Sequence, residues 1–106
     1  MFDLEKLKNN NAVFWTFLLP DIRKVAADCG WAIGIHGLLS NDLDLMAMPW
    51  TEECASADNL ANIIQSVVDN GGRPYIKTEG VKPHGRVVYT IYAGNSYIDL
   101  SIMKHG

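Results

Sequence analysis

Two segments of this chain alternate between polar and apolar side chains, and this alternation constrains the fold more than any other feature. Segment 42–48 begins Asp-Leu-Asp-Leu, and segment 97–103 reads Tyr-Ile-Asp-Leu-Ser-Ile-Met. Side chains two residues apart in a β-strand point to the same face, so each segment is predicted to be a strand with one apolar face. If both apolar faces pack on one core, Asp42, Asp44 and Asp99 emerge together on the opposite face.

The rest of the chain predicts helices and further strands around this pair. Apolar residues at three- and four-residue steps predict a helix that ends at Asp28, in which Pro20 either causes a kink or starts a second helix. A second amphipathic pattern predicts a helix over 56–70, with Ser56 as its N-cap. The other predicted elements are strands at 31–36, 73–77 and 86–92, a turn at 37–41 and a hairpin loop at 93–96. This order predicts an α/β fold of the two-layer α+β type, a mixed sheet with helices on one face.

Length and composition limit the classes of protein to which the chain can belong. A chain of 106 residues has room for one domain, which we place at 1–106. The longest apolar run is far shorter than the ~20 residues that span a bilayer, and the acidic start lacks the apolar stretch of a secretory signal. We therefore expect no membrane association and a cytoplasmic location. The net charge of −3 argues against generic nucleic-acid binding, which depends on neutralised phosphates. Cys29 and Cys54 are expected to be reduced, mostly buried thiols.

The three aspartates indicate a particular chemistry if their carboxylates meet. Two carboxylates about 4 Å apart repel by about 4 kcal/mol at an effective dielectric of ~20, so such a group either takes up protons or holds a cation. Oxygen ligands without Cys or His favour Mg²⁺ or Mn²⁺ over zinc. A carboxylate triad with two such ions activates an attacking oxygen and neutralises a phosphoryl leaving group. The alternative is that these acids are solvated residues at strand ends.

The acidic residues and the turn before them resemble the nucleotidyltransferase superfamily, which includes DNA polymerase beta and the minimal nucleotidyltransferases. That family has an apolar strand, a Gly-Ser turn, an Asp-x-Asp strand and a third Asp on a later strand. Gly37, Asp42, Asp44 and Asp99 match this pattern, and the resemblance spans 31–103. The chain looks still closer to short phage and prophage proteins, which combine a His-Gly turn, Asp-Leu-Asp-Leu, a following Pro-Trp and a terminal Ile-Asp-Leu-Ser.

The resemblance implies a metal-dependent transfer of a nucleotidyl group from a nucleoside triphosphate to a hydroxyl. Asp42 and Asp44 would bind the Mg²⁺ or Mn²⁺ ions and the phosphates, and Asp99 would complete the metal site and help to activate the acceptor hydroxyl. Gly37 would let the backbone approach the phosphates. In so short a chain the acceptor must be small, or be presented by a protein partner or a second copy in a homodimer. The resemblance also implies a phage- or prophage-encoded protein in the cytoplasm of a bacterial host.

Two departures from the family pattern leave a second interpretation open. Leu38 stands where the family has a phosphate-binding serine, which Ser40 would have to replace, and only four residues separate Gly37 from Asp42. The second interpretation is a catalytically degenerate member of this fold that acts as a binding or regulatory module. A third interpretation is an unrelated small α/β interaction domain whose aspartates are scattered on the surface.

Other residues are candidates for contacts with a ligand. Arg86 is the phosphate-binding candidate of a loop that also holds Lys82 and His84, because a guanidinium suits phosphate best. A solvated loop is the simpler interpretation of that segment. His36, beside the turn, is expected to bond to backbone rather than to a phosphate. Trp50 follows a proline and is expected to be partly exposed.

Overall fold

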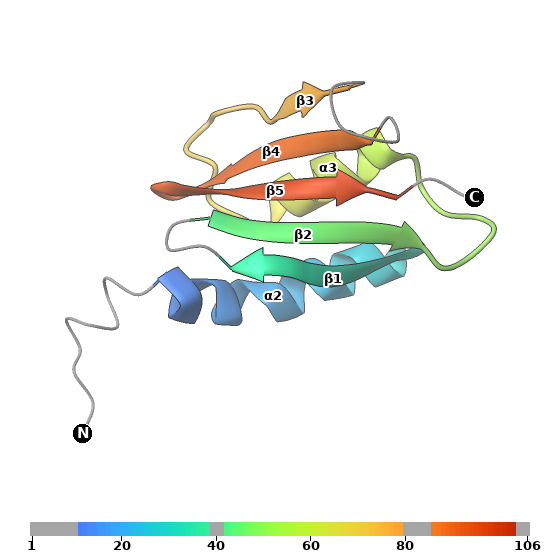
Figure 1. Cartoon of the computed structure of the whole chain (residues 1–106), viewed down its shortest axis with the longest axis horizontal. Coiled ribbons are helices and arrows are strands. Elements are labelled where there is room, and N and C mark those ends of the chain that lie inside the picture. The colour runs from blue at the N-terminus through green and yellow to red at the C-terminus, as the bar shows by residue number, and fades with distance from the viewer. Residues whose placement is uncertain (1–10, 39–41, 80–85, 104–106) are drawn as a thin grey trace.

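Five strands form one mixed sheet in the computed structural model of the chain, which describes residues 11–38, 42–79 and 86–103. The elements in chain order are α2 (Asn11–Asp28), β1 (Trp31–Leu38), β2 (Asp42–Pro49), α3 (Ala57–Ser66), β3 (Ile76–Thr78), β4 (Val87–Ala93) and β5 (Ser96–Ile102). Across the sheet the strands lie in the order β1-β2-β5-β4-β3 (Figure 1). The pair β2–β5 is parallel, and the other three pairs are antiparallel. The two strands that carry the aspartates are therefore neighbours inside the sheet.

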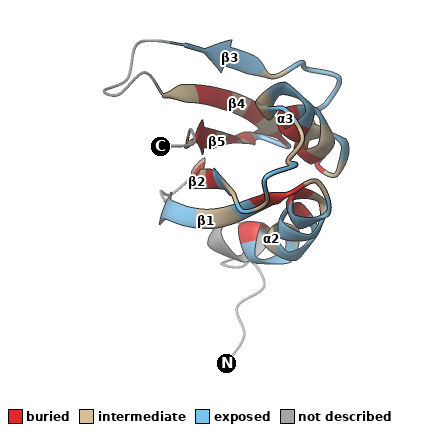
Figure 2. Ribbon diagram, turned by 90° about the vertical axis from the view of Figure 1, so that its right-hand side faces the viewer, coloured by how far each residue is buried: buried red, intermediate tan, exposed pale blue. Residues whose placement is uncertain are grey.

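The two helices of the described residues lie on one face of the sheet, and neither covers the opposite face, here called the open face (Figure 1, Figure 2). Helix α2 packs along β1, and α3 contacts β4. Buried core residues belong to both helices and to strands β1, β2, β4 and β5, and Figure 2 shows buried segments in the helices and in the sheet. The predicted fold class is confirmed: this is a two-layer α+β fold with a mixed sheet and its helices on one face.

The alternation in β2 and β5 corresponds to burial on the helix-covered face. Leu43 and Leu45 of β2 and Ile98 and Leu100 of β5 have no exposed surface. Burying such a side chain contributes roughly 1.5–3 kcal/mol, so a shift of one residue in either strand would move this apolar set into water. Because these four side chains are buried, the alternate residues of both strands, the aspartates included, lie on the open face.

Helix α2 ends at Asp28, as predicted, two residues before Gly30. The helix runs without interruption through Pro20, so that proline does not start a second helix. At its end the amide of Gly30 donates to the carbonyl of Ala27 at 3.1 Å, and Gly30 adopts a φ of 92°. Glycine is common just past a helix end because other residues resist this left-handed conformation. Neither helix of the described chain has both the length and the apolar character needed to cross a membrane.

Helix α3 begins at the predicted residue and ends earlier than predicted. The hydroxyl of Ser56 accepts a hydrogen bond from the amide of Asn59 at 3.2 Å, which satisfies one of the unpaired amides of the first turn. The helix ends at Ser66, four residues before the predicted end, and the amide of Val67 caps it by donating to Ile64. Gly71 and Gly72 lie farther along, in the following turn.

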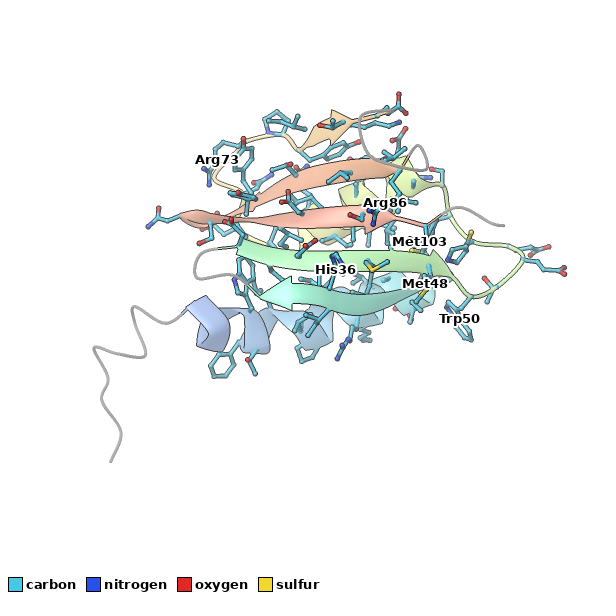
Figure 3. The ribbon with its side chains drawn as sticks, viewed as in Figure 1. His36, Met48, Trp50, Arg73, Arg86 and Met103 are labelled. Carbon is cyan, nitrogen blue, oxygen red and sulfur yellow. The ribbon has the colours of Figure 1, made fainter. Side chains whose placement is uncertain are left out.

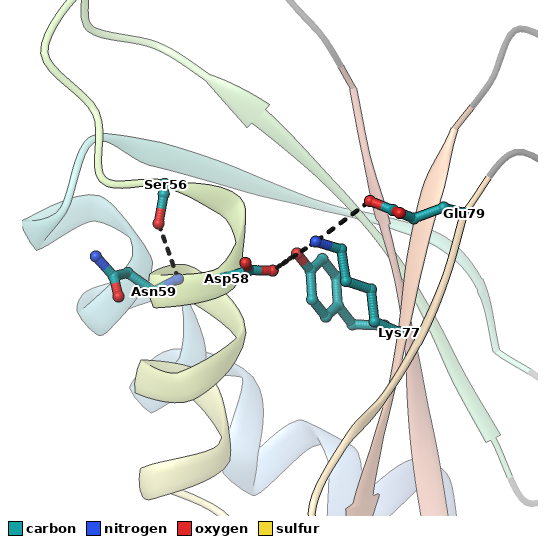
Figure 4. Close-up of polar contacts among 6 residues, drawn as sticks. Ser56, Asp58, Asn59, Lys77 and Glu79 are labelled. Atoms are coloured by element: carbon teal, nitrogen blue, oxygen red, sulfur yellow. Dashed lines mark hydrogen bonds and ion pairs between the residues drawn. The ribbon is translucent and has the colours of Figure 1, made fainter.

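The first turn of α3 is tied to the edge of the sheet by a small polar network (Figure 4). Asp58 accepts a hydrogen bond from the hydroxyl of Tyr89 on β4, and its carboxylate lies 2.9 Å from Nζ of Lys77 on β3. Lys77 also lies 3.3 Å from the carboxylate of Glu79. The hydrogen bond from Tyr89, followed by that from Lys77, lowers the pKa of Asp58. The network links α3, β3 and β4.

The β4–β5 connection is tighter than predicted. Ala93 and Ser96 are paired across the two strands, so only Gly94 and Asn95 form the turn, where four loop residues were expected. Gly94 has a φ of 61°, a conformation that short hairpin turns require and glycine accepts at low cost.

The edge strand β3 is shorter than predicted and begins three residues later. A strand was predicted over 73–77, whereas β3 covers only three residues, Ile76–Thr78. Arg73 instead serves the neighbouring hairpin, because its guanidinium donates to the carbonyl of Gly94 at 2.5 Å and lies over the ring of Tyr92, 4.6 Å from its centre. A side chain with a three-carbon stem and a planar cation can make such contacts from a loop. Strand periodicity does not reveal contacts of this kind.

Candidate functional site

The open face of the sheet carries the aspartates in a fixed register. In the parallel pair β2–β5, Asp44 is the direct partner of Asp99, and Asp42 is the partner of Tyr97. On the other side of β5, Asp99 is paired with Thr90 of β4. Direct partners on neighbouring strands share a face and lie about 4.8 Å apart, so Asp44 and Asp99 stand side by side. The predicted meeting of acids from two separate segments therefore occurs for this pair.

The third aspartate is on the same face but does not complete a cluster. Asp42 lies two residues before Asp44 along β2, about 6.6 Å away at 3.3 Å per residue. Within residues 11–38, 42–79 and 86–103, no three His, Cys, Asp or Glu side chains are close enough together to hold a metal ion. The arrangement is a pair of carboxylates with a third acid at one side.

Each of the three carboxylates has its own neighbour on the open face. Oδ2 of Asp44 lies 3.1 Å from Nδ1 of His36, and Oδ1 of Asp99 accepts a hydrogen bond of 3.2 Å from the hydroxyl of Thr90.

Asp42 is engaged with the tyrosine opposite to it in β5. A hydrogen bond with its carboxylate, followed by that carboxylate's charge, raises the pKa of Tyr97. Burial and the charge of Asp99 act in the same direction. The effect of both acids on one phenol indicates that the open face is negatively charged along β5.

An irregularity in β1 brings His36 to this face. Ile35 is paired with Leu45 and Gly37 with Asp44, so the register shifts at His36, which has no partner of its own in the ladder. Such an extra residue often re-aims a side chain beside a functional site. The expectation that His36 would bond to backbone is wrong, because its ring nitrogen contacts the carboxylate of Asp44. Gly37, predicted to approach phosphates, is the strand residue opposite Asp44.

A polar pocket of about 110 Å³ lies over the carboxylate pair. Its lining residues come from every strand except β3 and from the residue just before β4; they are His36, Asp44, Arg86, Val88, Asp99 and Ser101. Figure 3 shows His36 and Arg86 in front of β2 and β5, on the face away from the helices. The pocket thus combines two carboxylates, a guanidinium, an imidazole and a hydroxyl.

The structure brings some of the predicted site residues together and not others. Asp44, Asp99 and Arg86 line one pocket, whereas Asp42 is not among the residues that line it. Ser40, the predicted substitute for the family's phosphate-binding serine, lies outside the described residues, as do Lys82 and His84.

Sequence reasoning did not single out Thr90, Tyr97 and Ser101 as members of the site. Ser101 and Tyr97 follow the same two-residue period as Asp99, so their place on the open face was readable. Thr90 comes from β4, and its position opposite Asp99 depends on a register that the sequence does not contain.

Larger apolar side chains lie at the far end of the same face. Met48 and Trp50 are 46% and 63% exposed, and Figure 3 shows them with Met103 at the end of β2 and β5. The expectation that Trp50 is partly exposed is confirmed. An apolar area therefore lies beside the polar pocket on one surface.

The described residues of the pocket offer two carboxylates and no group of three metal-ligating side chains. Two adjacent carboxylates with a neighbouring hydroxyl are the oxygen donors that Mg²⁺ and Mn²⁺ prefer. A two-ion site needs carboxylates that bridge both ions, and the third acid, Asp42, is engaged with Tyr97 instead.

Comparisons of the chain with models of protein families, with curated proteins and with solved structures found no match. The nucleotidyltransferase family therefore stays a resemblance based on the residues named above.

Proposed function

We propose that this domain binds the phosphate of a nucleotide together with a divalent cation on the open face of its sheet, as a nucleotidyltransferase-like binding module. The observation that supports this most is the register pair Asp44–Asp99, which shares a pocket with Arg86 and His36. Two carboxylates on directly paired residues of neighbouring strands, whose backbones lie about 4.8 Å apart, favour a cation between them. A guanidinium at the same pocket suits the phosphate oxygens that such a cation brings with it.

The side chains around the pair have separate roles in this proposal. Asp44 and Asp99 would hold the Mg²⁺, which would neutralise the charge of the phosphate when bound. His36 orients the carboxylate of Asp44, and the hydroxyl of Thr90 orients that of Asp99. Arg86 binds a phosphate oxygen from the β4 side. A pocket of about 110 Å³ accepts a phosphate rather than a whole nucleotide, so the sugar and base lie outside it on the open face.

Three observations favour binding over catalysis. The carboxylate of Asp42 interacts with the hydroxyl of Tyr97, and no three His, Cys, Asp or Glu side chains of the described residues are placed to hold a metal ion together. The sequence also lacks the serine after Gly37 with which the family contacts phosphate. A site with one ion and one phosphate contact is suited to holding a ligand.

Nucleotidyl transfer is the second candidate, and the position of Asp42 favours it. Asp42 lies on the same face as the pair and only two residues from Asp44, so a change in its contact with Tyr97 would bring it toward the pocket. The chain's own residues would then bind the triphosphate and orient a hydroxyl acceptor supplied by a small molecule, a protein partner or a second copy. Tyr97→Phe removes the hydroxyl that engages Asp42 and is the variant that tests this candidate.

Thermal unfolding with Mg²⁺ alone, with ATP or GTP alone and with both together tests the binding proposal. A ligand at about 100 times its Kd stabilises a protein by ~2.7 kcal/mol, which raises the Tm of a domain this size by several degrees. We expect this rise only with Mg²⁺ and nucleotide together. Asp44→Asn and Asp99→Asn should each abolish it, whereas Asp21→Asn, which removes the same charge from the exposed surface of α2, should leave it intact.

The arginine contact has its own matched pair of variants. Arg86→Ala should weaken nucleotide binding about tenfold or more and leave binding of Mg²⁺ alone unchanged, while Arg23→Ala on the outer surface of α2 should change neither. A Tm rise that survives in Asp44→Asn and Asp99→Asn would contradict the proposed site.

An activity measurement separates the two candidates. Release of pyrophosphate from a nucleoside triphosphate, with incorporation of the labelled nucleotide into an acceptor or the protein, indicates transfer. If the wild type or Tyr97→Phe shows this release and Asp42→Asn abolishes it, nucleotidyl transfer replaces the binding module as the function. We expect binding without release.

A further inference from the structure

The end of α2 and the connection from β2 to α3 bring the two cysteines of the chain close together. Cys29 follows the last residue of α2, and Cys54 lies in the connection before α3. The amide of Ala55 donates to the carbonyl of Cys29 at 2.8 Å, and the amide of Trp50 donates to the carbonyl of Gly30 at 3.1 Å. These two hydrogen bonds hold the connection against the helix end at the residues where the cysteines lie.

The separation of the two cysteines is limited by this backbone contact. The bond between Ala55 and Cys29 allows the Cα atoms of Cys29 and Cys54 to be no more than about 8 Å apart, given standard bond lengths. A Cβ placed on Gly30 would lie 2.8 Å from Cα of Cys54 and 2.9 Å from its Cβ. A disulfide requires roughly 4.4–6.8 Å between Cα atoms, so a small adjustment of the connection suffices.

Both sulfurs are reduced and partly accessible. Sγ of Cys29 donates to the carbonyl of Ala26 at 3.3 Å, and both cysteines are half-buried. Burial raises the pKa of the Cys29 thiol, and the neighbouring Cys54 and Asp28 raise it further. The influence of Cys54 on this thiol is a second indication that the two sulfurs are near each other. A hollow of about 440 Å³, open to solvent, borders Cys29 and gives a small reagent access to it.

We propose that Cys29 and Cys54 form an intramolecular disulfide by exchange with a small-molecule disulfide such as oxidised glutathione. One protein thiolate attacks the small disulfide, so that a mixed disulfide forms and one glutathione thiolate leaves. The second protein thiolate then attacks the sulfur of the mixed disulfide, the protein S–S bond forms and the second glutathione leaves. The two thiol protons pass to the two glutathione thiolates, the protein loses two electrons and the glutathione disulfide gains them.

The bond would close a loop that contains β1 and β2 and would fasten α2 to the connection that follows them. Constraining this loop in the unfolded chain should stabilise the fold. Trp31 reports on the change, because its indole N–H donates at 2.8 Å to the carbonyl of Ala55, the residue after Cys54. The cysteines adjoin the end of the hairpin at which Trp31 pairs with Pro49, whereas the pocket residues His36 and Asp44 lie toward the other end. The proposal does not depend on the proposed function.

The test incubates the full chain with oxidised glutathione, blocks remaining thiols in denaturant and measures the intact mass and the disulfide-linked peptides. We expect a monomer two hydrogen atoms lighter, a peptide pair linking Cys29 to Cys54, altered fluorescence of Trp31 and a Tm raised by about 5 °C or more, reversed by dithiothreitol. Cys29→Ser and Cys54→Ser should each stop at one glutathione adduct without the rise in Tm.

Three outcomes would overturn the proposal. They are a wild type that keeps both thiols, one that carries glutathione on both cysteines without closing the bond, and one that forms disulfides only between chains or only when unfolded by urea. Cys29→Ala with Cys54→Ala, an uncharged pair of similar size, shows whether the reduced fold tolerates these changes and so keeps the single variants interpretable.

Discussion

The two faces of strands β2 and β5 are built from alternate residues of the same segments, yet they carry opposite chemistry. On the covered face Leu43, Leu45 and Leu100 have no exposed surface. On the open face the residues between them include Asp44 and Asp99, partners in register and half-exposed. Burial of the apolar side chains on the covered face determines the register of the two strands. The same register places two carboxylates side by side on the open face, although the stability of the fold does not require it.

The covered face supplies the stability of these strands, and the open face holds the candidate binding residues. Apolar contacts on the covered face are non-directional and large in sum, so they hold the strands in place. The acidic pair on the open face repels and would be unfavourable without a cation or a compensating charge. A feature that the fold does not need for its stability, kept beside an arginine and a histidine in one pocket, is a candidate for ligand binding.

Truncation on the covered face should give the largest effect of all. Leu45→Ala removes fully buried methyl groups and leaves a cavity, so it should lower the free energy of unfolding by about 2–5 kcal/mol. Met46→Ala, on the next residue and the half-exposed open face, should cost about 1 kcal/mol or less. Urea denaturation of both variants measures the difference. Equal losses would mean that the open face is packed as a second core.

Two glycines in the same region should respond differently to alanine. Gly30→Ala needs a φ of 92° and places a Cβ 2.5 Å from Oγ1 of Thr51, so it should destabilise the fold by at least about 1–3 kcal/mol. At Gly34, on β1, a Cβ meets nothing within 4 Å, and alanine should leave stability unchanged or raise it by up to about 1 kcal/mol. Thermal melts of the two variants measure these effects. A neutral Gly30→Ala would show that the connection after β2 is free to move.

The polar network at the rim of the covered face should make a pH-dependent contribution. The pKa of Asp58 is lowered by the hydrogen bond from Tyr89 and by Lys77, so the contribution is present above the pKa of the unfolded chain, about 3.9, and is lost as the pH falls through the lower folded value. Asp58→Asn should therefore be less stable than the wild type at about pH 7 and equal to it at about pH 2. Urea midpoints at several pH values measure this. A gap that persists at about pH 2 would refute the electrostatic origin.

Neutralising one member of the acidic pair should have the smallest effect on stability. Asp99→Asn weakens its contact with Thr90 but relieves repulsion with Asp44, so the free energy of unfolding should change by less than about 1 kcal/mol. Chemical denaturation without added metal is the measurement. A loss of several kcal/mol would mean that Asp99 is a structural residue, and the assignment of the pair to ligand binding would be weakened.

The alternation of residues was enough to predict the two faces of β2 and β5. Burial on one side of a strand enforces a period of two, so Leu43, Leu45, Ile98 and Leu100 were readable as core positions. The capping serine of α3 was readable for a similar reason, because its hydroxyl satisfies a local backbone requirement.

The composition of the pocket could not be predicted in the same way. That Asp44 lies opposite Asp99, and Asp99 opposite Thr90, follows from pairing between segments far apart in the chain. The shift of register at His36 and the use of Arg73 in a neighbouring hairpin depend on local geometry that periodicity does not encode. Which side chains share a face follows from the two-residue period of a single strand. Which side chains share a pocket follows from how the strands pair in the sheet.

The most direct test of the proposed site at Asp44 and Asp99 is to observe where a divalent ion binds. Titration of the isotope-labelled chain with Mn²⁺ broadens the NMR signals of amides close to the ion. We expect substoichiometric Mn²⁺ to broaden the amides around Asp44 and Asp99 first, and we expect Asp44→Asn to remove this broadening while Asp21→Asn does not. Broadening that is strongest at other acids, or that is unchanged in Asp44→Asn, would contradict the assignment of the carboxylate pair as the binding site.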